Sequence, residues 1–507
     1  MAIVIGLDVG TSGTKAIAMD AKGTLLAASQ VVYPLDSPRP GWAEQDPALW
    51  KAAAFEALAQ LAHQVKADEV TGIGLTGQMH GSVFLDGANN VLRPALLWCD
   101  QRTAPQCDEI TRTVGAGELL EMVSNPALPG FTAPKILWLR EHEPAIYEQV
   151  VRVLLPKDYI RLVLTGEYAT DVADASGTLL FDVKNRNWHT DLMSILGIDP
   201  DFMPRAFEGT EVTGTLTPEA AQKTGLPAGI PVVAGGGDQA AGGVGCGIVR
   251  PGVISSTLGT SGVTFAFSEK VAMDPQGRVH TFCHAVPGAW HVMGVMLAAG
   301  GSLQWFRDML CQAERTVAAE TGRDPYEYIT EAAAKVPHGA EGLIFLPYLS
   351  GERTPHKDPY AKGAFIGLSL RHSKAHMARA VLEGVAMGMR DSLELITGMG
   401  VPVDEIRASG GGARSPLWRR IMTDVHGMPF WTINVDEGPS YGAAILASVA
   451  AGFYKDVPEA CDTIIRTVDE SPVESSNVHF YDMWYREYQN AYNVLAPSFQ
   501  RCAEILR

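Results

Sequence analysis

The stretch GLDVGTSGTK at residues 6–15 decides the fold, because STLGTSGVTF at residues 256–265 repeats its Gly-Thr-Ser-Gly core. Short apolar runs flank both copies: AIVIGLD and TKAIAMD around the first, GVISSTLG and VTFAFS around the second. A glycine-rich turn between two such runs is typical of a β-hairpin. We therefore expect residues 10–13 and 259–262 to be the tips of two antiparallel hairpins, one in each half of a duplicated chain.

Strands and helices alternate beyond the hairpins. The turn DAKG at residues 20–23 leads into an expected strand, and a helix is expected from Asp46, a capping residue followed by Pro47. A buried strand is expected at residues 70–77. In the second half, a strand, the glycine loop at 410–412, a helix starting at Ser415, a strand at 429–435 and a helix at 440–452 follow one another. Such alternation predicts an α/β protein in both halves.

A chain of 507 residues exceeds the size of one ordinary core, so two large domains are expected. The glycine-rich segment GGGDQAAGGVGCGIVRPG at residues 235–252 precedes the second hairpin. We therefore expect an N-terminal domain at residues 1–248 and a C-terminal domain at residues 249–507.

Charge and cysteine content exclude several function classes. The formal net charge is −17, with 57 acidic and 40 basic residues, which argues against nucleic-acid and anionic-membrane partners. The seven cysteines form no Cys-x-x-Cys pair, which disfavours a disulfide framework or a thiolate zinc site. The start MAIVIGLDVG lacks the basic region of a secretory signal. We expect a soluble, cytoplasmic protein.

Glycine-rich loops at the ends of strands can gather backbone N–H groups around an anion. Four such loops lie at residues 10–13, 235–237, 259–262 and 410–412, so a polyphosphate site is favoured over plain tight turns. The Walker A pattern is absent, and GGVGCG meets the dinucleotide fingerprint poorly. The remaining scheme has two domains that each offer a hairpin loop to one nucleotide.

Two long segments, GFTAPKILWLREH at residues 130–142 and GAFIGLSLRHSKAHMARAVLE at residues 363–383, resemble the two signatures of the FGGY family of carbohydrate kinases. Thr132, Lys135 and Trp138 match the first signature. The resemblance extends through about residue 450 and implies two actin-like (ribonuclease H-like) ATPase domains with an interdomain cleft. It also implies ATP and Mg²⁺ as the nucleotide and metal.

Several motifs are most similar to the family members that phosphorylate D-xylulose: GQMHGSVFLD, LLWCDQR, LLPKDYIRLVLTGE, GGGDQAAG and LPYLSGERTPH. Glycerol-specific members carry Arg-Glu where this chain has Met79 and His80. The implied reaction is transfer of the γ-phosphate of ATP to the 5-hydroxyl of D-xylulose, giving D-xylulose 5-phosphate and ADP. Gln239 and Cys99 depart from the pattern, which leaves a kinase for another ketopentose or a pentitol as an alternative. A sugar-independent actin-like ATPase is a further alternative.

The resemblance implies a role for each candidate residue that the pattern alone leaves open. Asp238, otherwise a turn aspartate, would be the catalytic base, and Asp8, otherwise a strand cap, would face the metal. The sugar would be bound by Met79, His80, Asp238 and Gln239, with Trp98, Asp100 and Arg102 as support. The nucleotide would be bound by Gly10, Thr11, Ser12, Gly259, Thr260, Ser261, Gly411 and Gly412.

The histidines and cysteine in HTFCHAVPGAWH, namely His280, Cys283, His284 and His291, lack the spacing of known zinc sites, so no zinc is expected there. The expected partners are a small sugar and ATP. A homodimer is left open.

Overall fold

The computed structural model describes residues 2–435 and 437–505 and divides the chain into two compact units. Unit 1 contains Met1–Arg250, Phe267–His291 and Glu437–Ile465, and unit 2 contains Pro251–Ala266, Val292–Asp436 and Arg466–Arg507. The predicted division at residues 248 and 249 lies beside one crossing between the units. The segments at 267–291 and 437–465 return to unit 1, which the composition of the chain did not indicate.

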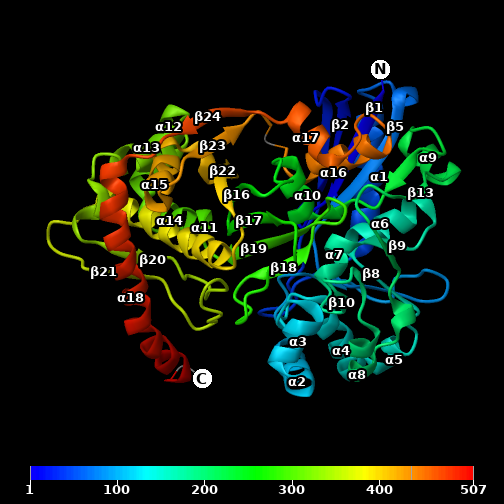
Figure 1. Ribbon diagram of the computed structural model, residues 1–507, viewed down its shortest axis with the longest axis horizontal. Coiled ribbons are helices and arrows are strands. Elements are labelled where there is room, and N and C mark those ends of the chain that lie inside the picture. Colours follow the sequence, from blue (N-terminus) through cyan, green and yellow to red (C-terminus); the bar gives the residue numbers. More distant parts are fainter. Residues whose placement is uncertain (1, 436, 506–507) are drawn as a thin grey trace. The chain divides into compact units, whose positions relative to one another are not determined.

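Unit 1 contains one large sheet and many short strands and helices (Figure 1). The strands of the large sheet are β1 (Ile3–Val9), β2 (Gly13–Asp20), β3 (Leu25–Val32), β5 (Val70–Gly77), β13 (Val212–Thr215), β14 (Pro231–Val233) and β15 (Gly236–Gly237). The short strands are β4 (Glu44–Gln45), β6 (Val83–Leu85), β7 (Ala95–Leu96), β8 (Arg152–Leu154), β9 (Ala169–Asp171), β10 (Phe181–Asp182), β11 (Asn187–Trp188) and β12 (Arg205–Phe207). Strand β18 (His280–Cys283) is the edge strand of the second large sheet. The helices are α1 (Pro47–Ala62), α2 (Ala104–Val114), α3 (Ala116–Val123), α4 (Thr132–His142), α5 (Pro144–Tyr147), α6 (Pro156–Thr165), α7 (Val172–Ser176), α8 (Thr190–Leu196), α9 (Pro218–Thr224), α10 (Asp238–Gly245), α16 (Pro439–Ala450) and α17 (Val457–Ile464).

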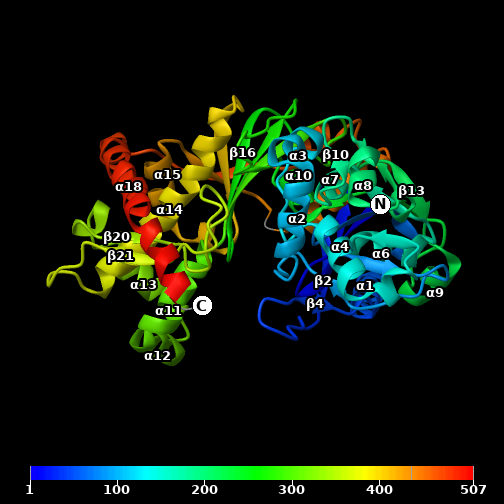
Figure 2. The same cartoon turned by 90° about the horizontal axis from the view of Figure 1, so that it is seen from below.

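Unit 2 is built around a second large sheet. Its strands are β16 (Gly252–Leu258), β17 (Gly262–Ser268), β19 (Trp290–Met296), β22 (Val403–Ser409), β23 (Phe430–Ile433) and β24 (Thr467–Ser471), with a separate pair β20 (Ile344–Leu346) and β21 (Ala364–Ile366). The helices are α11 (Gly300–Leu310), α12 (Gln312–Thr321), α13 (Pro325–Ala333), α14 (Lys374–Gly398), α15 (Pro416–His426) and α18 (Ser475–Ile505). Helices α14, α15 and α18 pack against one another beside the sheet (Figure 2).

The two large sheets share one topology. Six strands follow the same order in both sheets: β3-β2-β1-β5-β14-β13 in unit 1 and β19-β17-β16-β22-β23-β24 in the second sheet, where β18 adds a further strand beside β19. The central strand of each sheet, β1 or β16, pairs antiparallel with the next strand of its hairpin and parallel with β5 or β22. The outer pairs β13–β14 and β23–β24 are antiparallel in both. The two predicted hairpins, with turns between β1 and β2 and between β16 and β17, are confirmed, and so is the α/β class.

The local signals that start the helices act as the sequence predicts. The Asp46 carboxylate accepts a hydrogen bond from the N–H of Ala48 at the start of α1, and the Ser415 hydroxyl accepts one from the N–H of Trp418 at the start of α15. These bonds satisfy N–H groups that the first helical turn leaves unpaired.

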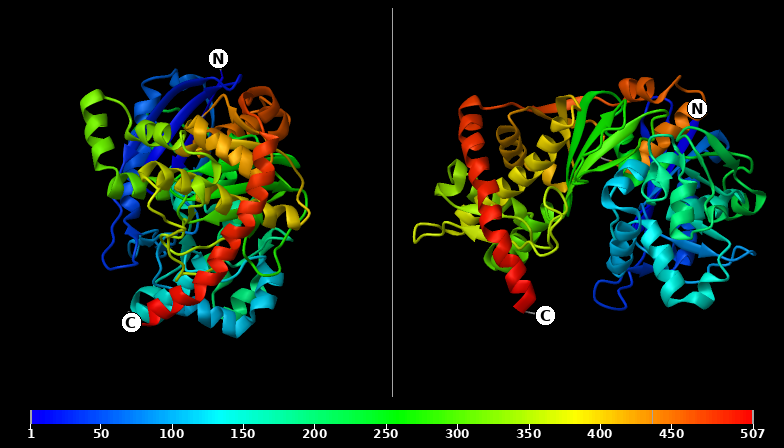
Figure 3. Two further views of the ribbon diagram at one scale, coloured as in Figure 1. Left: turned by 90° about the vertical axis from the view of Figure 1, so that its left-hand side faces the viewer. Right: turned by 60° about the horizontal axis from the view of Figure 1, so that its bottom comes forward.

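The long helix α18, drawn in red in Figure 3, carries the buried tyrosines Tyr481, Tyr485, Tyr488 and Tyr492. The hydroxyl groups of Tyr481, Tyr485 and Tyr492 donate to the carboxylates of Glu383, Asp391 and Asp358 at 2.7, 2.5 and 2.9 Å. Each bond pairs a buried acid that would otherwise be costly to bury. These bonds tie residues 481–492 of α18 to the rest of unit 2.

Helix α16 lies on the strands β1 and β5 and on helix α10, although it follows them by hundreds of residues (Figure 1). A Cβ atom at Gly442 in α16 would overlap the carbonyl oxygen of Ala241 in α10. The helix backbones therefore touch directly, which is why unit 1 needs residues 437–465.

This contact predicts the effect of two alanine substitutions in the same helix pair. Gly442→Ala should destabilise the protein by about 3 kcal/mol or more, because backbone must move to admit the methyl group. Gly242→Ala should be tolerated, because the nearest atom, Cγ of Pro439, would lie 3.7 Å from the new Cβ. Thermal and urea unfolding of both variants measure the difference. Equal stability of the two variants would contradict the packing described.

Candidate functional site

The parallel strands β1, β5 and β15 bring polar residues together at their carboxyl ends. Asp8 of β1 lies opposite Thr76 of β5, and Thr76 lies opposite Gly236 of β15, two residues before Asp238. Ligands of α/β sheets bind at this edge. The register of three strands therefore gathers residues that are far apart in the sequence.

Asp8 and Thr76 present unsatisfied polar atoms at this edge. Among the described residues, neither the buried Oδ1 atom of Asp8 nor the Oγ1 atom of Thr76 has a hydrogen-bond partner. Burial and the nearby negative charge of Asp238 raise the pKa of Asp8 to about 7, although Lys15 opposes the shift. Buried polar atoms are normally paired, so this pair indicates a place for a ligand.

The equivalent positions in unit 2 are filled differently. Thr257 of β16 lies opposite Ser409 of β22, and their hydroxyl groups bond to each other at 2.7 Å. The pair in unit 2 thus satisfies itself, whereas Asp8 and Thr76 do not. Thr76 is a candidate site residue that the sequence did not single out. Thr76 can be identified by comparing the equivalent strands of the two repeats.

Asp238 is half-buried and begins helix α10 directly after β15. Burial raises the pKa of its carboxyl to about 6, while a hydrogen bond from Nε2 of Gln239, at 3.3 Å, opposes the shift. A Cβ atom at Gly237 would lie 2.7 Å from Cγ of Met79. The Met79 side chain therefore packs against the backbone that carries Asp238.

Met79 and His80 lie in the turn that follows β5, where the conformation of His80 is fixed by its backbone and a hydrogen bond. His80 has a positive φ of 68°, and its Nδ1 atom lies 2.6 Å from the carbonyl oxygen of Gly177. Because a carbonyl can only accept, Nδ1 carries the proton, and the neutral ring then has Nε2 as its acceptor. Met79, His80, Asp238 and Gln239 thus lie near one another and near Asp8. Their role in sugar binding stays a prediction.

The first glycine loop is held from several sides. The hydroxyl of Thr11 donates to Oε1 of Gln78 at 3.1 Å and accepts from Nε1 of Trp98 at 3.0 Å. The hydroxyl of Tyr33 donates to the carbonyl of Gly10 at 2.6 Å. Because the single hydroxyl proton of Thr11 is used by Gln78, we expect backbone N–H groups and the exposed Ser12, rather than this hydroxyl, to meet an anion.

Asp100 and Arg102, expected as support, form a buried ion pair. Nη2 of Arg102 lies 2.7 Å from Oδ2 of Asp100, and the guanidinium lies 3.5 Å from the ring centre of Trp42. The neighbouring Cys99 is a half-buried free thiol. These contacts stiffen the loop that presents Trp98, whose side chain is 39% exposed.

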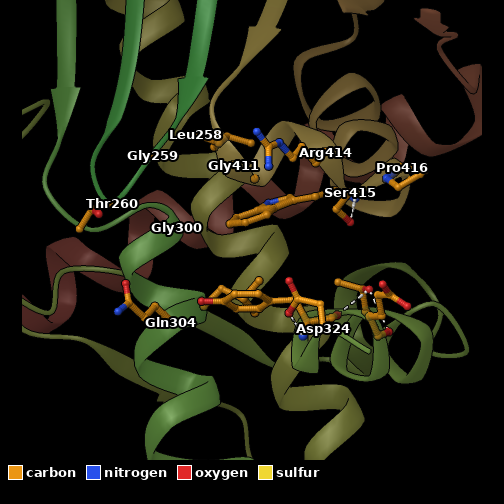
Figure 4. Close-up of a pocket in the computed structure, with 16 residues that line it drawn as sticks. Leu258, Gly259, Thr260, Gly300, Gln304, Asp324, Gly411, Arg414, Ser415 and Pro416 are labelled. Carbon is orange, nitrogen blue, oxygen red and sulfur yellow. Dashed lines mark hydrogen bonds between the residues drawn. The ribbon is translucent and has the colours of Figure 1, made fainter. Parts of the chain in front are cut away.

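Unit 2 contains a cavity of about 630 Å³, within the usual range for small-molecule pockets. The turn Gly259–Thr260, the start of α11, helix α13 and the loop from Gly411 to Ser415 surround it (Figure 4). Gly411 and Ser415 lie on one side and Gln304 and Asp324 on the opposite side. A Cβ atom at Gly411 would meet open space, which fits a position facing the cavity.

The second glycine loop is tied to the start of α11. The carbonyl of Gly259 accepts from the N–H of Gly300 at 2.8 Å, and the carbonyl of Thr260 accepts from the N–H groups of Ala299 and Gly301. Gly412 packs against the buried Trp418, which lines the cavity with Tyr326. The structure thus joins Gly259, Thr260, Gly411 and Gly412 around one pocket, and half-buried Ser261 follows in the same turn. The sequence analysis did not indicate that α11 and α13 form walls of this cavity.

Metal ligands are few in the part of the chain that the structure describes. It contains no group of three or more His, Cys, Asp and Glu side chains arranged to hold a metal ion. Mg²⁺ often uses only one or two carboxylates besides phosphates and water. The unsatisfied carboxylate oxygen of Asp8 fits that mode of binding.

Within residues 2–435 and 437–505, no helix combines the length and apolar character needed to cross a bilayer.

Comparisons with known proteins cover nearly the whole chain. Residues 3–245 and 254–451 match the N-terminal and C-terminal domains of the FGGY family of carbohydrate kinases. A xylulose kinase of Escherichia coli (strain K12) is 42% identical over 475 residues, 94% of this chain and 94% of that protein. A xylulose kinase of Bacillus subtilis (strain 168) is 38% identical over 99% of this chain and 100% of that protein. The crystal structure of a xyloylose kinase from Brucella ovis is 37% identical, with a TM-score of 0.89 over 98% of this chain and 99% of that one.

The raised pKa of Asp8 predicts that its carboxylate destabilises the folded protein. The ionised form is disfavoured on folding, so the cost begins above the unfolded pKa of 3.8 and grows until the pH passes about 7. Asp8→Asn should therefore raise the free energy of unfolding by about 1–3 kcal/mol at pH 8, and by less at pH 5. Urea unfolding at both pH values measures this.

Asp20→Asn serves as the matched control. The Asp20 carboxylate accepts backbone hydrogen bonds from Lys22 and Thr24, both at 2.8 Å, so its loss should destabilise the hairpin. A loss of stability in Asp8→Asn at pH 8 would refute the burial cost assigned to Asp8.

Proposed function

The chain belongs to the FGGY family of carbohydrate kinases, and we propose that it transfers the γ-phosphoryl group of ATP to D-xylulose, giving D-xylulose 5-phosphate and ADP. The predicted family is confirmed, as is the fold of two actin-like, sheet-based domains. The observation that carries the proposal is the half-buried Asp238, which begins α10 beside Met79 and Asp8. The relatives named xylulose kinase support the choice of sugar.

Asp238 is the proposed catalytic base. Phosphoryl transfer depends mostly on positioning and charge, and an aspartate can orient the attacking hydroxyl and accept its proton. With a pKa of about 6, the Asp238 carboxyl is largely ionised at neutral pH and still a better proton acceptor than an exposed aspartate. The bond from Gln239 holds one of its oxygens.

Met79, His80 and Gln239 are the proposed sugar contacts. The bond between Nδ1 of His80 and the carbonyl of Gly177 fixes the orientation of the proposed sugar-binding ring. Met79 supplies an apolar wall against Gly237. Together with Asp238 they offer both donors and acceptors to a polyhydroxyl substrate, as sugar binding requires.

The cavity of unit 2 is the proposed adenosine site. Gly411 and Gly412 face or border it, and Tyr326 and the largely buried Trp418 contribute aromatic rings to its lining. The loops at Gly10, Thr11 and Ser12 and at Gly259, Thr260 and Ser261 are the proposed phosphate contacts. The N–H of Gly10 already donates to the carbonyl of Gly13 at 3.0 Å, so the proposed phosphate donors are other backbone N–H groups of these loops.

Asp8 is proposed to face Mg²⁺. The metal ion would neutralise negative charge on the phosphates of ATP. Oδ1 of Asp8 has no protein partner among the described residues, so it remains able to meet the metal or its water. The net charge of −17 supports the proposal that neither nucleic acid nor an anionic membrane is a partner. A cytoplasmic location stays a prediction. A homodimer stays a prediction.

Two alternatives remain open. Gln239 and Cys99, which depart from the pattern of D-xylulose kinases, keep another ketopentose or a pentitol as a candidate substrate. A sugar-independent ATPase is disfavoured by the convergence of His80, Met79 and Asp238, which ATP hydrolysis alone does not need.

A substrate panel tests the proposal. ADP release should depend on sugar, and kcat/KM should be highest for D-xylulose among ketopentoses, pentitols and glycerol. ATP turnover without sugar should be slow by comparison, because the acceptor hydroxyl is missing. A preference for D-ribulose or glycerol would sink the assignment to D-xylulose and keep the kinase. Fast turnover without sugar would favour the ATPase.

Asp238→Asn tests the proposed base. The amide keeps the shape but cannot accept the proton, so kcat should fall by about 10²–10⁴ while sugar and ATP still bind. In the wild-type protein, kcat should fall as the pH drops below about 6, because protonated Asp238 cannot act as base. Rate measurements between pH 5 and 8 check both points. A near wild-type kcat in the variant would rule out the mechanism.

A further inference from the structure

The first turn of helix α4 lies against His80 and makes two side-chain bonds to its backbone. Nζ of Lys135 lies 2.8 Å from the carbonyl oxygen of His80, and Oγ1 of Thr132 lies 3.1 Å from the same oxygen. Both side chains are fully buried. Lys135 also donates to the carbonyl of Gly130 at 2.7 Å. One carbonyl, that of a residue with positive φ, thus receives two donors from one helical turn.

The same turn also anchors the segment that holds the His80 ring. The N–H of Ala133 donates to the carbonyl of Thr178 at 2.9 Å, and the preceding carbonyl, that of Gly177, accepts from Nδ1 of His80. A Cβ atom at Gly177 would lie 2.5 Å from Nδ1, so ring and backbone are in close contact. Backbone and ring of His80 are therefore fixed from the same place.

Burying the ammonium group of Lys135 costs free energy, so a lysine at this position needs a compensating interaction. Both acceptors of Lys135 are backbone carbonyls, and burial lowers the pKa of its ammonium group to about 7, with Asp100 opposing the shift. A methionine would fill similar space without desolvating an amine. What a methionine lacks is the donor to the carbonyl of His80. A left-handed conformation at a histidine also persists only where its surroundings enforce it.

We propose that Thr132 and Lys135 are positioning residues for sugar recognition, which act by holding the His80 backbone in its left-handed conformation and thereby orienting the ring. The inference rests on the proposed function, since it takes His80 as a sugar contact. Both residues belong to the first signature segment and are buried. Neither contacts the substrate in this scheme, because each acts through His80.

Conservative variants isolate the hydrogen bonds from the packing. Thr132→Val removes the donor at similar volume, and Thr132→Ser keeps it. Thr103→Val is the matched control, because the buried Thr103 donates at 3.0 Å to the carbonyl of Pro129 rather than to His80. Lys135→Met removes the stronger donor. Circular dichroism and melting curves establish which variants fold. If Lys135→Met does not fold, the comparison of Thr132→Val with Thr132→Ser decides the test.

Steady-state kinetics with D-xylulose and ATP then give the expected pattern. Thr132→Val should lower kcat/KM for the sugar by about 3–10-fold and Lys135→Met by about 10–100-fold, as expected for neutral and charged hydrogen bonds. KM for ATP should change by less than about twofold in both, because the bonds act on the sugar side. Thr132→Ser and Thr103→Val should behave like the wild-type protein. Equal losses for sugar and ATP, or no loss, would overturn the inference.

A double-mutant cycle with His80→Asn separates this inference from the proposed function. Asparagine tolerates a left-handed backbone but has no imidazole ring. If Thr132 acts through the ring, Thr132→Val should cost less than about twofold in that background. The full cost remaining there would reject the inference and leave the sugar site intact. An unchanged sugar kcat/KM in His80→Asn itself would reject both the site assignment and the inference.

Discussion

Unit 1 depends on direct contact between the backbone of α16 and that of β1 and β5. A Cβ atom at Gly6 would overlap the carbonyl oxygen of Ser440, and one at Gly74 would overlap that of Ala443. Backbone packed on backbone leaves no flexible side chain to absorb a shift. The same helix touches α10 through Gly442, so the strand that carries Asp8 and the helix that begins with Asp238 are fixed by one element.

The two copies of the sheet differ at the carboxyl ends of their central strands. The strand ends of unit 1 carry Asp8 and Thr76 with unsatisfied atoms, whereas the equivalent Thr257 and Ser409 of unit 2 bond to each other. Unit 2 instead places a cavity beside its hairpin turn. One strand order thus carries two different edges, because the difference lies in a few polar side chains rather than in the strands.

The features that local sequence determines were predictable, and those that depend on distant partners were not. The hairpin turns, the caps at Asp46 and Ser415 and the buried strand before Met79 all follow from short patterns. The return of residues 437–465 to unit 1 depends on the shape left by glycines hundreds of residues earlier. The candidate residues Asp238 and His80 stood out mainly through resemblance. Thr76 and the cavity wall at Gln304 and Asp324 become visible only once register and packing are known.

The position of α16 in the chain has a consequence for biosynthesis. A ribosome delivers residues in order, and a domain generally folds once its own residues have emerged. The strands β1 and β5 emerge early, yet the helix that covers them ends at Ala450. Until then the nascent chain exposes an apolar sheet face whose glycines leave the backbone unshielded. The first core of this protein is therefore completed late in its synthesis, and a truncated product ending before residue 437 would lack the helix that covers β1 and β5.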